Sequence, residues 1–340
     1  MKAVIIVDME GATGITSDRS GWVLNGSDDW ERFGRDLITG DVVAAATGAL
    51  AGGAEAVTIF DFHNRRDSIR PEALPPGATL LNFGDFLVPF GGLDRSHRVA
   101  FLVGFHAKEG TPGIHAHTVA HHVTDVRLNG LSVGEVGMFA GSLDALGVRF
   151  GLITGDQAAC DEAAALAPGV ETAPVKRRLP DGAETALPAA ESAELIRARA
   201  ERAVRRVDEL PPMTLGRPTR LEVSLRRPEM TAFERRPGLE RVDDRTFAAW
   251  TTSAHYAVCL FYEELQALFT PLVQKLVEDD ERWWAELKAR YPSFDWKSPA
   301  FLAERERHGL THWFGYWTAE ARRAIEELVA ASSRVLSCDA

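Results

Sequence analysis

Short runs of β-branched and other apolar residues alternate with longer amphipathic stretches through the first 160 residues of this 340-residue chain. This alternation is typical of a parallel sheet that is covered by helices. We expect strands near residues 3–8, 56–62, 98–105 and 148–154, and helices over 30–50 and 133–146. The pattern therefore predicts an α/β protein with a three-layer α/β/α core and a mostly parallel sheet.

The composition changes after this core. Residues 178–188 are rich in Pro, Gly and Ala, which indicates a break in the chain. A clean alternation at 221–225 then predicts a half-buried strand, and Ser253 is expected to cap a helix that runs to about Leu268. We predict three parts: an α/β core (1–177), a small α+β subdomain (178–268) and a helical, Trp-rich C-terminal extension (269–340).

The C-terminal extension carries five of the eight tryptophans, namely Trp283, Trp284, Trp296, Trp313 and Trp317. Aromatic side chains at this density usually bury against something. A helical appendage packed on the body is the simpler interpretation, because aromatic clusters are more often core than recognition surface. The alternative is that these aromatic residues form a subunit interface or a lid over a functional site.

Charge and composition exclude several function classes. The formal net charge is −11 at pH 7 and there is no long basic block, which argues against nucleic acid and anionic membrane surfaces as partners. No stretch approaches the roughly 20 apolar residues of a membrane span, and the apolar run before Asp8 is too short for a signal peptide. The three cysteines form no CxxC pair, so neither disulfides nor a thiolate zinc site is expected. We expect a cytoplasmic protein.

The first predicted strand ends in Asp8-Met9-Glu10-Gly11, with two carboxylates two residues apart. Residues i and i+2 of a strand share a face, so both acids point the same way. Like charges at this distance repel unless a positive charge lies between them, and a metal ion is the best candidate. The next two runs end in His63 and His106, whose imidazoles could complete its coordination shell at the same edge of the sheet.

Five of the ten histidines fall between His106 and His122. Thr111-Pro112-Gly113 makes this stretch a loop, and such a loop could supply both a metal ligand and a general base. Glu135 follows at the start of a predicted helix. Gly11-Ala12-Thr13-Gly14 could instead be a phosphate-binding loop, but its spacing matches no phosphate motif and the neighbouring acids would repel a pyrophosphate.

The candidate ligands are too many for one catalytic zinc, which must keep a coordination position open. They are Asp8, Glu10, His63, His106 and Glu135. Two ions that share Asp8 fit this number better, with three protein ligands each. Such a pair suits hydrolysis, because it acidifies a water molecule and polarises a carbonyl group.

The motifs Asp8-Met9-Glu10-Gly11, Gly104-Phe105-His106-Ala107, Thr111-Pro112-Gly113 with His117, and Val133-Gly134-Glu135 together resemble the M55 family of metallopeptidases. The resemblance covers roughly residues 1–175 and continues more loosely to about 268. It implies a D-aminopeptidase with two zinc ions per subunit in a ring-shaped homodecamer. It also implies that Asp8 bridges the ions, that Glu10 and His63 complete one site and His106 and Glu135 the other, and that His117 is the catalytic residue.

The sequence thus predicts a zinc aminopeptidase that removes an N-terminal residue, such as D-Ala, from a short peptide or amide. His117 would move the proton or act as the nucleophile. Two alternatives remain: an amidohydrolase that uses the same metal pair on a non-peptide amide, and a non-catalytic protein that binds peptides or metal.

Overall fold

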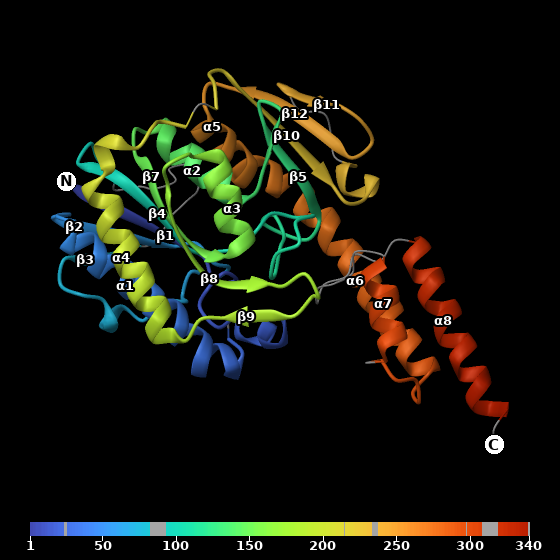
Figure 1. The fold of residues 1–340 in the computed structure, drawn as a ribbon. Coiled ribbons are helices and arrows are strands. Elements are labelled where there is room, and N and C mark those ends of the chain that lie inside the picture. Colours follow the sequence, from blue (N-terminus) through green and yellow to red (C-terminus); the bar gives the residue numbers. More distant parts are fainter. Residues whose placement is uncertain are drawn as a thin grey trace.

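A seven-stranded sheet forms the core of the described part of the chain, in the order β3-β2-β1-β4-β7-β8-β9 (Figure 1). The computed structural model describes residues 1–23, 26–81, 93–213, 215–232, 237–296, 298–307 and 319–338. The strands of this sheet are β1 (Lys2–Val7), β2 (Ala56–Asp61), β3 (Ala78–Leu81), β4 (His97–Phe105), β7 (Arg149–Asp156), β8 (Glu171–Arg178) and β9 (Glu184–Ala186). All neighbours from β3 to β8 are parallel, and only β9 pairs antiparallel with its neighbour.

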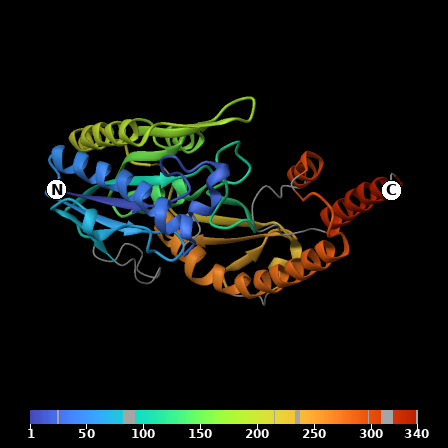
Figure 2. The ribbon, with the colours of Figure 1, turned by 90° about the horizontal axis from the view of Figure 1, so that it is seen from below.

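Helices cover both faces of this sheet (Figures 1 and 2). On one face, α1 (Arg35–Ala51) packs along α4 (Ala189–Arg205). On the other face lie α2 (Glu135–Ala145) and α3 (Gln157–Leu166). Alternate residues of β1 contribute to the two cores, with Ile6 on the α2 side and Ile5 on the α1 side. The predicted three-layer α/β/α core is confirmed.

A second, antiparallel sheet has the order β11-β12-β10-β5-β6. Its strands are β5 (Val123–Leu128), β6 (Leu131–Val133), β10 (Thr219–Leu225), β11 (Leu239–Arg241) and β12 (Thr246–Thr251). The alternation in β10 buries every second residue, as its sequence predicts. Because β5 and β6 precede residue 177, the smaller unit is assembled from two separate parts of the chain. The domain boundaries at 177 and 268 stay a prediction.

A long helical segment follows β12. It comprises α5 (Ala254–Cys259), the π-helical turn Leu260–Leu265 and α6 (Gln266–Arg290). The Ser253 hydroxyl accepts a hydrogen bond from the Tyr256 amide, which is the predicted cap. The helix does not end near Leu268 as the sequence suggested. It continues because Phe269 packs into the main core and Leu287 packs into the core of the extension.

The extension contains α7 (Pro299–Arg307) and α8 (Ala319–Cys338), which pack together at the end of α6, away from the large sheet (Figure 2). It has its own apolar cluster of Leu287, Phe301, Ala321, Ile325 and Val329. Trp283, Trp284 and Trp296 pack against this cluster, whereas Trp313 and Trp317 lie outside the described residues. The predicted helical extension is confirmed. Within the described residues, no helix has the length and apolar character needed to span a bilayer.

Candidate metal centre

The candidate ligands lie where the winding of the large sheet reverses. The chain runs from β1 outward through β2 to β3, then returns to β4 on the other side of β1. Open α/β sheets bind ligands at such a switch point, beyond the carboxyl ends of the strands. Asp8 follows β1 and His106 follows β4 directly, so both stand at this point.

Two glycines allow the strand ends to approach this closely. Gly104 has φ +78°, and a Cβ atom on it would lie 2.2 Å from the carbonyl oxygen of Asp8. A Cβ atom on Gly11 would lie 1.8 Å from the carbonyl oxygen of Phe105. The Gly11 amide instead donates to the Gly104 carbonyl oxygen at 2.8 Å. Any side chain at either position would separate the loop after β1 from His106.

Asp8, Glu10 and His63 form the first set of potential ligands, with their donor atoms within 4.8 Å of one another. The His63 Nδ1 atom lies 3.3 Å from Oδ1 of Asp8 and 3.0 Å from Oε2 of Glu10. Asp8 and His63 are buried, and Glu10 is mostly buried. This geometry gives two carboxylates and one imidazole facing a common point.

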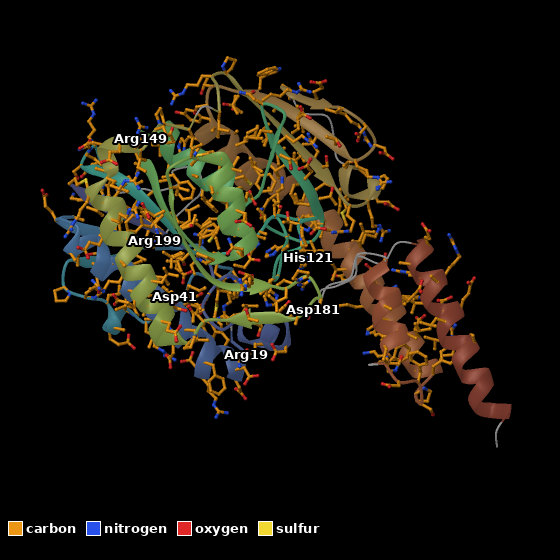
Figure 3. The ribbon with its side chains drawn as sticks, in the orientation of Figure 1. Arg19, Asp41, His121, Arg149, Asp181 and Arg199 are labelled. Carbon is orange, nitrogen blue, oxygen red and sulfur yellow. The ribbon has the colours of Figure 1, made fainter. Side chains whose placement is uncertain are left out.

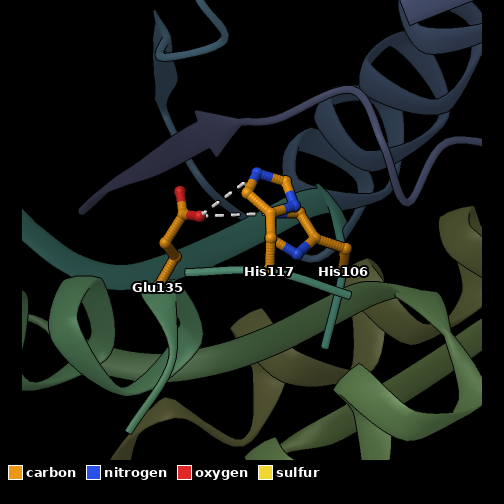
Figure 4. Close-up of side chains that lie close together, drawn as sticks. All are labelled: His106, His117 and Glu135. Carbon is orange, nitrogen blue, oxygen red and sulfur yellow. Dashed lines mark ion pairs between the residues drawn. The ribbon is translucent and has the colours of Figure 1, made fainter. Parts of the chain in front are cut away.

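His106, His117 and Glu135 form the second set, also within 4.8 Å (Figure 4). The His106 Nε2 atom lies 3.2 Å from Oε1 of Glu135 and 3.3 Å from Oδ2 of Asp8. His117 stacks on His106 with ring centroids 3.9 Å apart, and its Nε2 atom is 4.0 Å from Oε1 of Glu135. Asp8 thus faces the first set with one oxygen and the second set with the other.

A backbone carbonyl oxygen fixes each of the three imidazoles. His63 donates from Nε2 to the Val23 carbonyl at 2.8 Å, and His106 donates from Nδ1 to its neighbour's carbonyl, that of Ala107, at 2.9 Å. His117 donates from Nδ1 to the His115 carbonyl at 2.8 Å. A carbonyl oxygen can only accept, so the nitrogen that faces it carries a proton, and the other nitrogen is the one that can offer a lone pair to a metal ion. In each ring, that second nitrogen faces the carboxylates.

The donor atoms fit metal ions. Oδ2 of Asp8, Oε2 of Glu10 and Nε2 of His106 are buried and have no well-formed hydrogen bond to any described residue. Buried polar atoms are costly without a partner, and metal coordination supplies one. The set combines imidazole nitrogens and carboxylate oxygens, which are zinc ligands, and second hydrogen bonds hold the imidazoles as in known zinc sites.

The site groups also shift one another's pKa values. Burial disfavours the charge on Asp8, but the facing rings of His106 and His63 outweigh it and hold its pKa well below the usual range. The pKa values of His63 and His106 are raised, because the opposing carboxylates overcome the effect of burial. The pKa values of Glu10 and Glu135 are lowered in the same way. The site therefore favours bound cations.

Sequence reasoning missed the buried charged residues that hold the surrounding loops. Asp41 of α1, labelled in Figure 3, accepts from the amide and hydroxyl of Thr13 at 2.9 and 2.7 Å. Glu162 of α3 accepts from the amide of Gly134, next to Glu135, at 2.8 Å. Lys176 of β8 donates to the carbonyl oxygens of Glu10 and Ile15. A charged residue in the apolar middle of a predicted helix is the signal that could have revealed Asp41. Lys176 is followed by Arg177 and Arg178, so its burial left no such local signal.

The fold and the site together define a class, a metal-dependent hydrolase built on an α/β sheet. A family model described as D-aminopeptidase (peptidase M55) matches residues 1–262, and the chain belongs to this family. It is accordingly a metallo-aminopeptidase. The described structure holds all six predicted site residues together at one edge of the sheet.

Two relatives illustrate the similarity. A D-aminopeptidase from Bacillus subtilis (strain 168) is 32% identical over 217 residues, which are 63% of this chain and 77% of the relative. The solved structure of the Zn-dependent D-aminopeptidase DppA from Bacillus subtilis, described as a self-compartmentalizing protease, superposes with a TM-score of 0.73 at 27% identity. The match covers 79% of this chain and 98% of DppA.

Proposed function

We propose that this protein is a dinuclear zinc aminopeptidase that removes an N-terminal D-amino acid, such as D-Ala, from short peptides or amides. One observation carries the dinuclear proposal: Oδ1 of Asp8 lies 3.3 Å from His63, and its Oδ2 lies 3.3 Å from His106. A carboxylate that faces two separate ligand sets in this way is suited to bridging two ions. The preference for a D-residue rests on the description of the family and of both relatives.

In this proposal Asp8 is shared, Glu10 and His63 complete one zinc site, and His106 and Glu135 complete the other. His63 would coordinate through Nδ1 and His106 through Nε2, because the opposite nitrogens are held by backbone carbonyls. Zinc held there would lower the pKa of a water molecule and polarise the scissile carbonyl group.

His117 is proposed as the catalytic residue. Its Nδ1 proton is engaged with the His115 carbonyl, so Nε2 is available toward the ligand sets. The lone pair on Nε2 can accept a proton from the attacking water and return it to the leaving amine. The same lone pair would serve if His117 attacked the carbonyl directly, so the geometry supports both roles. The stacked contact with His106 fixes the ring plane.

We further propose that the chain acts as a cytoplasmic homo-oligomer, a ring of ten subunits. The support is the description of DppA as self-compartmentalizing, since a protease of that kind encloses its sites within an assembly. The aromatic extension lies outside the family match, at residues beyond 262. This difference from the family is the ground for a second candidate, an amidohydrolase that uses the same metal pair on a non-peptide amide.

Metal analysis, native mass and a substrate screen test the proposal together. We expect two zinc ions per chain, a large assembly, and hydrolysis of D-Ala peptides in preference to L-Ala peptides. Activity confined to unrelated amides would support the amidohydrolase. Two bound zincs without any hydrolysis would support a binding protein, and absence of bound zinc would contradict both enzymes.

A further inference from the structure

Lys176 is a buried lysine at the carboxyl end of β8, with 3% of its surface exposed. Its ammonium group donates hydrogen bonds to the carbonyl oxygens of Glu10 and Ile15. These two carbonyls lie at either end of the loop that leaves β1. Strands β4 and β7 separate β1 from β8, so this loop crosses the sheet edge before it meets Lys176.

Strand β9, which forms a hairpin with β8, holds the loop after β1 at a second point. Glu184 of β9 accepts from the amide and the hydroxyl of Ser17, both at 2.8 Å. Arg178 pairs with Glu184 at 2.8 Å and keeps it in place. The β8–β9 hairpin thus clamps residues 10–17 through one cation and one anion. The sequence suggested only a break in this part of the chain.

Burying a lysine costs free energy, because its ammonium group loses contact with water. Burial lowers the pKa of Lys176 to about 8, although the carboxylates of Asp156, Glu10, Asp41 and Glu184 oppose the shift. An apolar side chain would avoid the cost of desolvating the ammonium group. It would also leave two buried carbonyl oxygens without this donor, at the residue that carries a proposed ligand.

We propose that Lys176 is a positioning residue for Glu10: by fixing the Glu10 carbonyl, it aims the carboxylate at His63 and sets the affinity of one of the two zinc sites. This inference rests on the proposed function. Removing such a support from a ligand typically weakens metal binding by roughly 10- to 100-fold. The site of His106 and Glu135 is held by other hydrogen bonds, made by the backbone groups of Ala107, Val119 and Gly134. Its zinc affinity should therefore not change.

The test is zinc titration of the full-length protein carrying Lys176→Met, with Arg177→Met as the matched control. Arg177 is the next residue of the strand and is exposed, so its loss removes the same charge without touching the loop. We expect Lys176→Met to keep one tight zinc and to bind the second roughly 10- to 100-fold more weakly. Arg177→Met should bind both zincs as the wild type does.

Wild-type affinity for both zincs in Lys176→Met would overturn the inference, as would equal weakening of both sites. A wild-type protein that binds no zinc would instead refute the proposed function. Lys176→Gln, which keeps a neutral amide donor on a shorter side chain, provides a second variant and should show an intermediate affinity. Failure of both variants to reach the wild-type circular dichroism spectrum would make Lys176 a residue that the fold needs, and would also overturn the specific role.

Discussion

The ring of His117 is oriented by the carbonyl oxygen of His115, which accepts its Nδ1 proton at 2.8 Å. His117 also lies within the second ligand set, so its role has two possible forms, catalyst or ligand. We expect His117→Ala to lower kcat/KM by roughly 10²- to 10⁴-fold, the usual contribution of a general acid–base, and to leave the zinc content unchanged. Enzyme kinetics combined with metal analysis measures both.

His121→Ala is the control for this experiment. His121, labelled in Figure 3, belongs to the same loop. Its ring centroid is 5.2 Å from that of His117. The control should keep both zincs and most of the activity. If His117→Ala lost zinc, the assignment of His117 as catalyst would be wrong and it would be a ligand.

His115 holds its carbonyl in place with a left-handed backbone, at φ +55°. Glycine and asparagine adopt this conformation readily, whereas a β-branched residue does not. We therefore expect His115→Asn to retain most of the activity and His115→Val to lower kcat by at least about tenfold, because the carbonyl would turn away from His117. Equal kcat values for the two variants would show that the backbone conformation of His115 does not matter for catalysis.

The part of this site that follows from strand ends could be predicted from sequence. Asp8, His63 and His106 each stand next to a β-rich run, and parallel strands bring their carboxyl ends to one edge. The order of the strands, and therefore the switch point between β1 and β4, was not predictable because nothing local specifies which strands pair.

The geometry of the loop that carries His117 was harder to predict from the sequence. The position of His117 depends on a hydrogen bond from its amide to the Ala107 carbonyl and on Arg226, which donates to the His121 carbonyl from the end of β10. Arg226 is more than a hundred residues away in sequence. Contacts of this range leave no periodic signal. The β5–β6 hairpin is a different case, because Asn129 and Gly130, both at positive φ, form its turn and are a local hairpin signal that sequence reasoning overlooked.

Asp8 and Glu10 are predicted to differ in the number of zinc ions that they hold. Asp8 faces both histidine ligands, whereas the Glu10 carboxylate faces His63. Asp8→Ala should lose both zincs, and Glu10→Ala should mainly weaken one. Zinc content after dialysis against a weak chelator measures this difference. Equal loss from the two variants would indicate a mononuclear site.

His122 should make the stability of the fold depend on pH. It is buried against Phe269, and burial together with the nearby charge of Arg226 lowers its pKa to about 4. Below about pH 6.5 His122 binds a proton in the unfolded chain, whereas it stays neutral in the folded chain until about pH 4. The free energy of unfolding therefore falls as the pH drops from about 6.5 to 4, by an amount on the order of 3 kcal/mol.

Urea unfolding of the zinc-free protein at pH 7 and pH 5 tests this prediction. The difference in the free energy of unfolding between wild type and His122→Gln should shift by about 2 kcal/mol between the two pH values, with the wild type losing more at pH 5. Other titrating groups cancel in the comparison. A difference that does not change with pH would mean that folding does not lower the pKa of His122.

Asp280 is predicted to fix the C-terminal extension to the body. It lies in α6 with 3% of its surface exposed, and its carboxylate accepts from Arg322 of α8. The same oxygen is 3.9 Å from Arg227, which follows β10. Asp280→Asn would leave two partly buried guanidinium groups facing a neutral amide. This change is expected to lower the free energy of unfolding by about 1–3 kcal/mol. The loss is smaller than for a fully buried ion pair, because both arginines keep some contact with water.

Asp279→Asn provides the matched control, because Asp279 is the preceding residue of the same helix and its ion pair with Arg282 is exposed. An exposed pair contributes at most about 1 kcal/mol. Thermal unfolding followed by tryptophan fluorescence should report the extension, whose core is packed by Trp283 and Trp284. We expect Asp280→Asn to unfold this part at a lower temperature with both zincs retained, and Asp279→Asn to match the wild type. Identical melting curves for the two variants would show that the Asp280 contacts do not hold the extension.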